Sequence, residues 1–283
     1  MFQARKILRE FKPDVVIGTG GYVCGPVLFN ASMMGIKTLI HEQNVIPGLT
    51  NKILSKFVDA VLISFPDAKK YFNSKRVYLT GNPIRNEILS ANREKCRDIL
   101  RIGDKKLVVV FGGSIGAQKI NKTMIDYINS GIADNIKIIF GTGTREYENV
   151  RKELGCSNTK LDNVNIVPYI ENMHEVMPSA DLIICRAGAI TISEITAIGV
   201  PAILIPSPNV TSNHQEYNAR SLEKNGSVRV LIESELNKVN FKEYIETIIN
   251  DDKLLNKMKA NSKKSGITDA TEKILKIIEE MLR

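Results

Sequence analysis

Short apolar runs rich in valine and isoleucine alternate with helix-like segments along nearly the whole chain. This alternation constrains the fold most, because strands separated by helices of about 10–15 residues favour parallel sheets covered on both faces. It predicts an α/β chain built from Rossmann-like units. Strands are expected at Asp14–Gly18, Lys37–His41, Ala60–Phe65, Arg76–Thr80, Leu107–Phe111, Ile136–Phe140, Val164–Val167, Leu182–Cys185, Ala202–Ile205 and Val228–Ile232.

The alternation is interrupted once, at Gly81–Arg85, where Pro83 forces an extended residue before it. A polar helix, Asn86–Arg101, follows without a matching strand. We therefore predict a first domain at residues 1–86 and a second at residues 87–267. A last helix within 268–283 could pack back on the first domain, because it has an apolar stripe. That stripe consists of Ile274, Ile277, Ile278 and Met281.

The first domain is short for its class. The 283 residues of the chain suit two domains. However, the first has four predicted strands, whereas a doubly wound nucleotide-binding domain usually has about five or six. We therefore expect an incomplete first domain that lacks its opening βα units, as in a truncated or mis-started chain.

The charge balance is basic. Lys and Arg total 39 against 31 Asp and Glu, and the surplus gathers in residues 1–12 and 67–106. Such a surplus suits an anionic lipid surface, a phosphorylated substrate or a solvated face. The chain has no tryptophan and no zinc-finger spacing, so we expect no nucleic-acid partner. The cysteines form no C-x-x-C pair, which is typical of reduced cysteines in a cytoplasmic protein.

One uncharged stretch, Val15–Ile36, is long enough to cross a bilayer. Glycines interrupt its middle, at Gly18, Gly20 and Gly21, and Gly25 follows. A strand, a glycine turn and a helix therefore explain it better than a membrane span. This turn lets the backbone approach a ligand, or simply lets the helix pack closely.

A second glycine turn, Gly112–Gln118, follows an apolar strand and opens a helix. The backbone N–H groups of such a turn and the helix N-terminus together favour a phosphate. Gly112, Gly113 and Gly116 would form the turn, and Ser114 adds a hydroxyl. The segment is neither G-x-G-x-x-G nor a P-loop, so it does not indicate NAD or a P-loop nucleotide. A plain tight turn is the alternative.

Two further segments repeat this strand–turn–helix pattern. In Cys185–Glu194, Thr191 and Ser193 could cap the first helical turn. Glu194, also placed in that turn, would accept hydrogen bonds from a ribose diol or only complement the helix dipole. In Thr211–Asn218, Gln215 offers the donor and acceptor that a sugar hydroxyl needs. The alternative there is helix capping by Ser212 or Asn213.

Polar side chains also end a strand at His41–Asn44. His41 is a candidate general base, and Glu42 is its partner or a base itself. The chain contains no Asp-x-Asp, so we expect no metal site and no cofactor. Helix N-termini and Arg85, whose fork suits a phosphate, would then meet the charge of a diphosphate.

Seven segments, taken in order, resemble the MurG family of N-acetylglucosaminyl transferases over essentially the whole chain. They are KPDVVIGTGGYVCGP, HEQNVIPGLTNK, GNPIR, FGGSIGAQ, YIENM, CRAGAITISE and HQEYNA. The resemblance implies a GT-B fold, in which two Rossmann-like domains with parallel sheets face a cleft. It implies metal-independent, inverting transfer of N-acetylglucosamine from UDP-N-acetylglucosamine to the C4 hydroxyl of the muramyl sugar of lipid I. The product would be lipid II, used in peptidoglycan synthesis.

The resemblance also assigns roles by position. Asn44 would contact the donor, Arg85 and Ser114 the diphosphate, and Ile170 the uracil through its backbone. Gln215 would bind sugar hydroxyls, and His41 and Glu42 would line the acceptor side. The nucleotide and ribose would be held by Ala189, Ile190, Thr191, Ile192, Ser193 and Glu194.

The family's first strand leads into a glycine-rich loop ending in histidine, and no such loop precedes Met1. The general base could therefore lie in that segment instead of at His41 or Glu42. Two alternatives stand beside the transferase: a non-catalytic UDP-sugar-binding fragment that arises from truncation, and a UDP-N-acetylglucosamine epimerase of similar fold. The family is peripheral to the cytoplasmic side of the cell membrane. Met1–Phe11 mixes apolar and basic residues, as expected for contact with an anionic inner-membrane surface, although the helix could instead cover the sheet.

Overall fold

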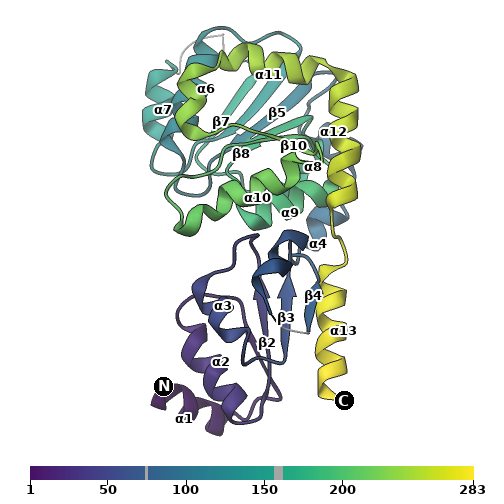
Figure 1. Ribbon diagram of the computed structural model, residues 1–283. Helices are drawn as coiled ribbons and strands as arrows, with labels where there is room; N and C mark the ends of the chain where they lie inside the picture. The colour runs from purple at the N-terminus through teal and green to yellow at the C-terminus, as the bar shows by residue number, and fades with distance from the viewer. Residues whose placement is uncertain (74–75, 156–161) are drawn as a thin grey trace. The chain divides into compact units, whose positions relative to one another are not determined.

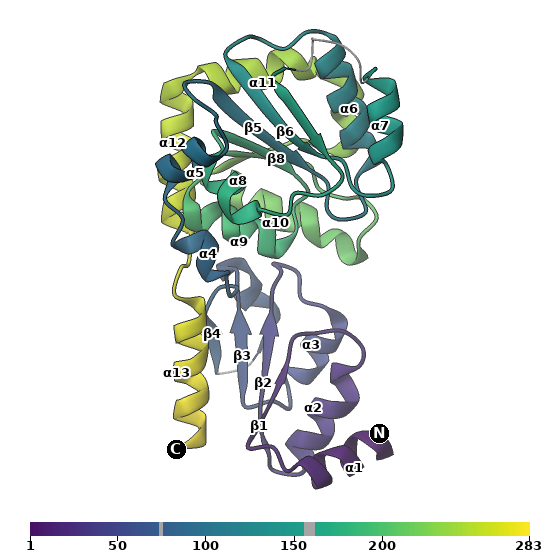
Figure 2. The ribbon, with the colours of Figure 1, turned by 180° about the vertical axis from the view of Figure 1, so that it is seen from behind.

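The computed structural model describes residues 1–73, 76–155 and 162–283. They form two compact units (Figures 1 and 2). The first consists of Met1–Ile84 together with Ile267–Arg283, and the second is Arg85–Gly266. Each unit is built on one parallel sheet with helices packed against it, as the alternation of the sequence predicts.

The first unit has a four-stranded sheet in the order β1-β2-β3-β4. Neighbouring strands are neighbours in sequence, and every pair is parallel. The strands are β1 (Val15–Gly18), β2 (Lys37–Glu42), β3 (Ala60–Ile63) and β4 (Val77–Leu79). The helices are α1 (Phe2–Phe11), α2 (Cys24–Met33), α3 (Leu49–Leu54), the 3₁₀ helix η1 (Pro66–Tyr71) and α13 (Ala270–Leu282).

Helices cover both faces of this sheet because successive strand residues point to opposite sides. Ile40, Val61 and Ile63 pack on one face with residues of α2 and α3. Leu39, Ala60 and Leu62 pack on the other face against α13, which lies beside this sheet in Figure 1. The side chains of α13 in that cluster are Ile274, Ile277, Ile278 and Met281. The predicted stripe and its return to the first sheet are thus confirmed.

The second unit has a six-stranded parallel sheet in the order β10-β9-β8-β5-β6-β7. Its strands are β5 (Lys106–Phe111), β6 (Ile136–Gly141), β7 (Val164–Val167), β8 (Leu182–Cys185), β9 (Ala202–Leu204) and β10 (Val228–Val230). Its helices are α4 (Asn86–Leu89), α5 (Arg93–Ile99), α6 (Gln118–Asn129), α7 (Tyr147–Glu153), α8 (Met173–Ser179), α9 (Ala189–Ile198), η3 (Thr211–Asn213), α10 (His214–Glu223), η4 (Glu233–Lys238), α11 (Phe241–Asn250) and α12 (Asp252–Ser265).

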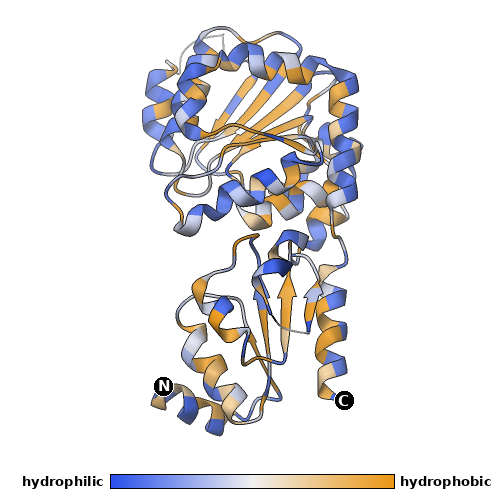
Figure 3. Ribbon diagram, viewed as in Figure 1, coloured by the Kyte–Doolittle hydropathy of each residue, from blue (hydrophilic) through white to orange (hydrophobic). Residues whose placement is uncertain are grey.

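The core of the second unit lies between this sheet and its helices. The central strands are hydrophobic along most of their length, as Figure 3 shows. Residues 107–110 of β5 and 182–185 of β8 are fully buried, which is expected for parallel strands covered on both faces. Met124 of α6 and Ile245 of α11 belong to the same buried cluster.

The predicted strands are all present within two residues at each end, and Val15–Ile36 forms β1, a glycine turn and α2 as expected. The single helix predicted at Asn86–Arg101 is wrong. It divides into α4 and α5 because Asn92 adopts an extended conformation, and its side chain accepts the N–H of Lys95 at 3.0 Å to start a new helix. Among the described helices, none has the length and hydrophobicity needed to cross a membrane.

Candidate functional site

A cavity of about 640 Å³ opens at the carboxyl edge of the second sheet. The chain leaves β5 towards β6 and β7, and later continues from β8 to β9 and β10 on the other side. The direction of winding therefore reverses between β5 and β8. The cavity is lined by Phe111 at the end of β5, and by Arg186 and Gly188 just beyond β8. Ligands of open α/β sheets bind at such switch points.

The glycine turn after β5 forms one wall. Gly113 and Gly116 have φ values of 97° and 94°, in the left-handed region that favours glycine. A Cβ on Gly116 would lie 2.3 Å from the carbonyl oxygen of Thr142, so only glycine allows this turn to pack on the loop after β6. The N–H of Thr144 also donates to the carbonyl of Ser114 at 3.2 Å. The turn is thereby held rigidly against its neighbour.

Two helices begin at the cavity wall. Gln118 and Lys119, the first residues of α6, line the cavity, as do Gly188 and Thr191 at the start of α9. A helix N-terminus carries about half a positive charge and N–H groups that point outward. Two such ends at one cavity favour an anionic ligand such as a diphosphate.

The expectations for the start of α9 need correction. Ser193 donates its hydroxyl to the carbonyl of Ala189 at 3.0 Å, and the N-cap position of α9 is Gly188, which has no side chain to cap the first turn. Thr191 lines the cavity instead of capping the helix. Glu194 is the sixth residue of α9, so it lies in the second turn rather than the first.

Glu194 is buried and paired with Arg85. Its Oε1 accepts hydrogen bonds from Nε and Nη2 of Arg85 at 3.2 and 3.0 Å. The side chain of Glu194 is 8% exposed and that of Arg85 is 56% exposed. Burial, and secondly the Glu194 charge, raise the pKa of the Cys185 thiol. Two residues predicted to bind different parts of a nucleotide thus bind each other here.

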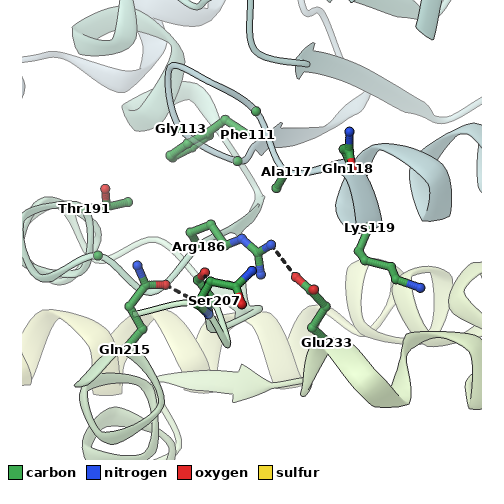
Figure 4. Close-up of a pocket in the computed structure, with 14 residues that line it drawn as sticks. Phe111, Gly113, Ala117, Gln118, Lys119, Arg186, Thr191, Ser207, Gln215 and Glu233 are labelled. Carbon is green, nitrogen blue, oxygen red and sulfur yellow. Dashed lines mark hydrogen bonds and ion pairs between the residues drawn. The ribbon is translucent and has the colours of Figure 1, made fainter. Parts of the chain in front are cut away.

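Gln215 lies on the first turn of α10 and lines the cavity. Its Oε1 accepts the N–H of Ser207 at 2.9 Å, as the dashed line in Figure 4 shows. The capping alternative for this segment is wrong. Asn213 is the N-cap residue of α10, but its side chain does not cap the helix; its amide donates to Glu216 at 2.6 Å instead.

An arginine and a glutamate at the cavity were missed by the sequence analysis. Arg186 donates to the carbonyl oxygens of Ile205 and Pro206 at 3.2 and 3.1 Å. It also forms an ion pair with Glu233 (Figure 4). Both residues follow directly after a predicted strand, Cys185 and Ile232 being the strand ends. Their positions at the carboxyl edge could have indicated a role.

The other predicted residues of this unit lie in varied surroundings. Gly112, like Gly113 and Gly116, lines the cavity. Ser114 is exposed on the glycine turn. Ile170 is buried, and its side chain lies 3.1 Å from where a Cβ on Gly141 would be. In α9, Ala189 and Ile192 are buried and Ile190 is exposed.

The predicted acceptor-side residues lie at the carboxyl end of β2 in the first unit. His41 is buried, with Nε2 2.9 Å from the carbonyl oxygen of Gly81 and Nδ1 3.2 Å from Nε2 of Gln43. The carbonyl contact requires Nε2 to carry the proton, so Nδ1 accepts from Gln43. Burial lowers the pKa of His41, although the Gly81 hydrogen bond and the Glu42 charge oppose it.

Glu42 is buried beside it and is surrounded by donors. Its Oε1 accepts the backbone N–H and the side-chain amide of Asn44 at 3.0 and 3.3 Å. Its Oε2 accepts the N–H of Gly48 at 3.1 Å and the amide of Asn51 at 2.8 Å. This carboxylate fixes the loop that carries Asn44. Its geometry fits a positioning role better than proton transfer, and the choice of base stays a prediction.

Comparison with known proteins identifies the family. Residues 1–63 match the glycosyltransferase family 28 N-terminal domain, and residues 107–274 match the glycosyltransferase family 28 C-terminal domain. The chain belongs to glycosyltransferase family 28. In the terms of this family, the cavity lies in the C-terminal domain, whereas His41 and Glu42 lie in the N-terminal domain.

Relatives within the family are close. The chain is 54% identical, over 284 residues, to the UDP-N-acetylglucosamine–N-acetylmuramyl-(pentapeptide) pyrophosphoryl-undecaprenol N-acetylglucosamine transferase of Acetivibrio thermocellus. The match covers 99% of this chain and 76% of that protein. The crystal structure of Acinetobacter baumannii MurG matches with a TM-score of 0.82 at 28% identity, over 99% of this chain and 77% of that one. The GT-B-like class, two α/β units with parallel sheets, is confirmed.

A more distant structure shares the fold alone. The UDP-GlcNAc 2-epimerase of Neisseria meningitidis, solved with UDP-GlcNAc bound, matches with a TM-score of 0.71 at 16% identity. The match covers 98% of this chain and 78% of that chain. The likeness at this identity concerns the architecture and does not favour the epimerase alternative.

Proposed function

We propose that this chain transfers N-acetylglucosamine from UDP-N-acetylglucosamine to the C4 hydroxyl of the muramyl sugar of lipid I, forming lipid II. The transfer inverts the anomeric centre. The named activity of a relative 54% identical over 99% of the chain supports this reaction for a member of family 28. The observation that carries it in the structure is the cavity at the switch point, into which two helix N-termini open.

The donor nucleotide is assigned to this cavity. The turn Gly112–Gly116 and the first turn of α6 offer N–H groups for the diphosphate. Glu194 has a carboxylate suited to a ribose diol, and we assign Arg85, whose guanidinium lies 3.0 Å from it, to the diphosphate of the same ligand. Ribose hydroxyls and a diphosphate would replace the contact between these two side chains with contacts to the ligand.

The reaction itself is a displacement. The C4 oxygen of the acceptor attacks the anomeric carbon, the bond from that carbon to the diphosphate oxygen breaks, and UDP leaves with the electron pair. The hydroxyl proton passes to a base, for which His41 and Glu42 are the candidates. Donors that face the developing charge on UDP lower the barrier, because they are oriented before the reaction begins.

The decisive experiment is a transfer assay with the full chain. Radiolabelled UDP-N-acetylglucosamine and a lipid I analogue with a short prenyl chain should give a labelled lipid-linked disaccharide. Omission of the analogue should abolish product. Formation of an epimerised UDP-sugar without acceptor would instead indicate the epimerase. Binding of UDP without any turnover would indicate the non-catalytic fragment.

The proposed location is the cytoplasmic face of the cell membrane, with α1 contacting anionic lipid. Phe2, Ile7 and Phe11 of this helix are 93%, 61% and 79% exposed. Arg5, Lys6 and Arg9 are exposed on the same helix. Exposed apolar side chains beside basic ones are typical of a helix that lies in a membrane interface.

Vesicle binding tests this location separately from catalysis. Co-sedimentation with phosphatidylglycerol vesicles should exceed that with phosphatidylcholine vesicles and should weaken at high salt. The variant Phe2→Ser/Phe11→Ser should bind less while keeping its affinity for UDP. Equal binding to both vesicle types by the unmodified chain would contradict the proposal.

A further inference from the structure

Arg186 and Glu233 form an ion pair at the cavity, and neither residue is assigned to the nucleotide. Their side chains are only 17% and 16% exposed. A buried ion pair is weak grounds for a contribution to stability, because desolvation of the two charges offsets their attraction. Its position among three loops at the carboxyl edge suggests a different purpose.

Arg186 connects the ends of three neighbouring strands. It follows β8, and its Nη1 donates to the carbonyl oxygens of Ile205 and Pro206, which follow β9. Its Nη2 pairs with Glu233, which begins η4 after β10. A guanidinium can do this because its donors diverge in a fixed plane, whereas a lysine ammonium has no such fork.

The segment that Arg186 holds is the one that orients Gln215. Ser207 comes directly after Pro206, and its N–H donates to Oε1 of Gln215 at 2.9 Å. Because that N–H is a donor, the oxygen of the Gln215 amide must face Ser207. The amide nitrogen then points away from Ser207, as Figure 4 shows for this cavity-lining residue.

We infer that Arg186 and Glu233 are positioning residues for the sugar half of the donor. They fix the segment 205–207, which fixes the Gln215 amide so that its NH₂ group, and not its oxygen, faces the ligand. The sugar is therefore recognised at this point through an oxygen that accepts a hydrogen bond. The inference rests on the proposed function, because it takes a UDP-sugar as the ligand.

The test compares the affinities of each variant for UDP and for UDP-N-acetylglucosamine, measured by calorimetry. The ratio of the two affinities reports the contribution of the sugar, and UDP binding shows that the cavity is intact. Gln215→Ala should lower the ratio roughly three- to tenfold, as expected for one neutral hydrogen bond. Glu233→Gln should lower it to a similar extent and leave UDP affinity within about twofold, since the inference assigns Arg186 and Glu233 to the segment that holds Gln215 and not to the nucleotide.

Two further variants separate geometry from charge. Arg186→Lys keeps the charge but loses the fork, so it should lower the ratio as Glu233→Gln does. The double variant Gln215→Ala/Glu233→Gln should lower it no further than Gln215→Ala alone, because both changes act through one amide. Asp252→Asn is the matched control. It removes a carboxylate that pairs with Lys106 at 2.6 Å outside the cavity, and it should leave the ratio unchanged.

The outcomes distinguish this inference from the proposed function. If the unmodified chain binds UDP no better than uridine, the assignment of the nucleotide fails. If Gln215→Ala lowers the ratio but Glu233→Gln and Arg186→Lys do not, the nucleotide assignment stands and the positioning inference is overturned. A parallel loss of UDP and UDP-sugar affinity in Arg186→Lys would also overturn it, because Arg186 would then act on the nucleotide.

Discussion

Both sheets have polar side chains at their carboxyl edges, but the surroundings of these side chains differ. At the first edge, His41 and Glu42 are buried and hydrogen-bonded to neighbouring groups of their own unit. At the second edge, Gln215 and the starts of α6 and α9 border a cavity of about 640 Å³. A run of polar residues after a strand therefore predicts that these side chains lie at the carboxyl edge of the sheet. Only their hydrogen bonds show whether they fix a neighbouring loop or face a ligand cavity.

The same contrast exists between the two Arg–Glu pairs of the second unit. Arg186 and Glu233 are both largely buried, and Arg186 also binds two carbonyl groups, so this pair belongs to the framework. Arg85 is 56% exposed, and its Nε and Nη2 both donate to the same oxygen of Glu194. An exposed partner is easily displaced, which suits a pair whose members are assigned to a ligand.

The largest expected effect concerns Glu42. Glu42→Ala removes the buried carboxylate that accepts from four donors, of which the Asn51 amide is buried and those of Asn44 and Gly48 are partly buried. The free energy of unfolding of the first unit should fall by about 3 kcal/mol or more, since each hydrogen bond to a charged group contributes roughly 1.5–3 kcal/mol. Urea unfolding measures the loss, and calorimetry should show unchanged affinity for UDP.

The control for Glu42 is Glu10→Ala. Glu10 is an exposed carboxylate of the same unit, 3.8 Å from Lys6, and its loss should change stability by less than about 0.5 kcal/mol. If Glu42→Ala were equally mild, the first edge would not be a closed hydrogen-bonded network. Its carboxylate would then be available for proton transfer.

The next effect concerns the glycine turn of the second edge. Gly116→Ala places a Cβ 2.3 Å from the Thr142 carbonyl at a φ of 94°, so the turn must move away from the loop after β6. The binding free energy of UDP should become less favourable by about 1–3 kcal/mol, the range for backbone strain of this kind. Gly113→Ala is the matched control. Gly113 has nearly the same φ, 97°, but nothing lies within 4 Å of its Cβ, so the loss should be smaller.

Variants of Glu194 and Arg85 should report separately on binding of the ribose and binding of the diphosphate. Glu194→Ala should weaken uridine and UDP alike by about 1.5–3 kcal/mol, because a charge-assisted hydrogen bond to the diol is lost. Arg85→Ala should weaken UDP but leave uridine affinity unchanged. Thermal-shift titrations with both ligands measure this. Unchanged UDP affinity in Glu194→Ala would remove Glu194 from the site.

The sequence predicted the strands well because buried parallel strands have a strong apolar signal, as in Leu107–Phe111 and Leu182–Cys185. It also placed Gly116 and Gln215 at the edge where they line the cavity. It failed where the answer depends on partners distant in the sequence. Arg85 lies 109 residues from Glu194, and Arg186 lies 47 residues from Glu233, so neither pair leaves a local pattern. Asn92 was missed because its side-chain cap begins a new helix, α5, inside a segment that composition alone would assign to one helix.

The smallest expected effect is the loss of stability of the first unit at acidic pH that results from His41. Burial lowers the pKa of His41 from its usual 6.5, so the folded chain holds the neutral ring while the unfolded chain takes up a proton below that pH. The stability that this provides is complete above pH 6.5 and is lost as the pH falls through the lowered pKa.

Urea unfolding of the first unit at pH 7.5, 6.5 and 5.5 should therefore show a steeper decline of stability in the unmodified chain than in His41→Gln. The difference is limited to about 1.4 kcal/mol per pH unit, the most that one titrating group can supply. Parallel declines would mean that the folded ring takes up its proton over the same pH range as the unfolded chain. Burial would then not lower its pKa, and the protonated ring could not accept from Gln43 at Nδ1. The ring would have to be held by other contacts, and the first edge would be less closed than its hydrogen bonds indicate.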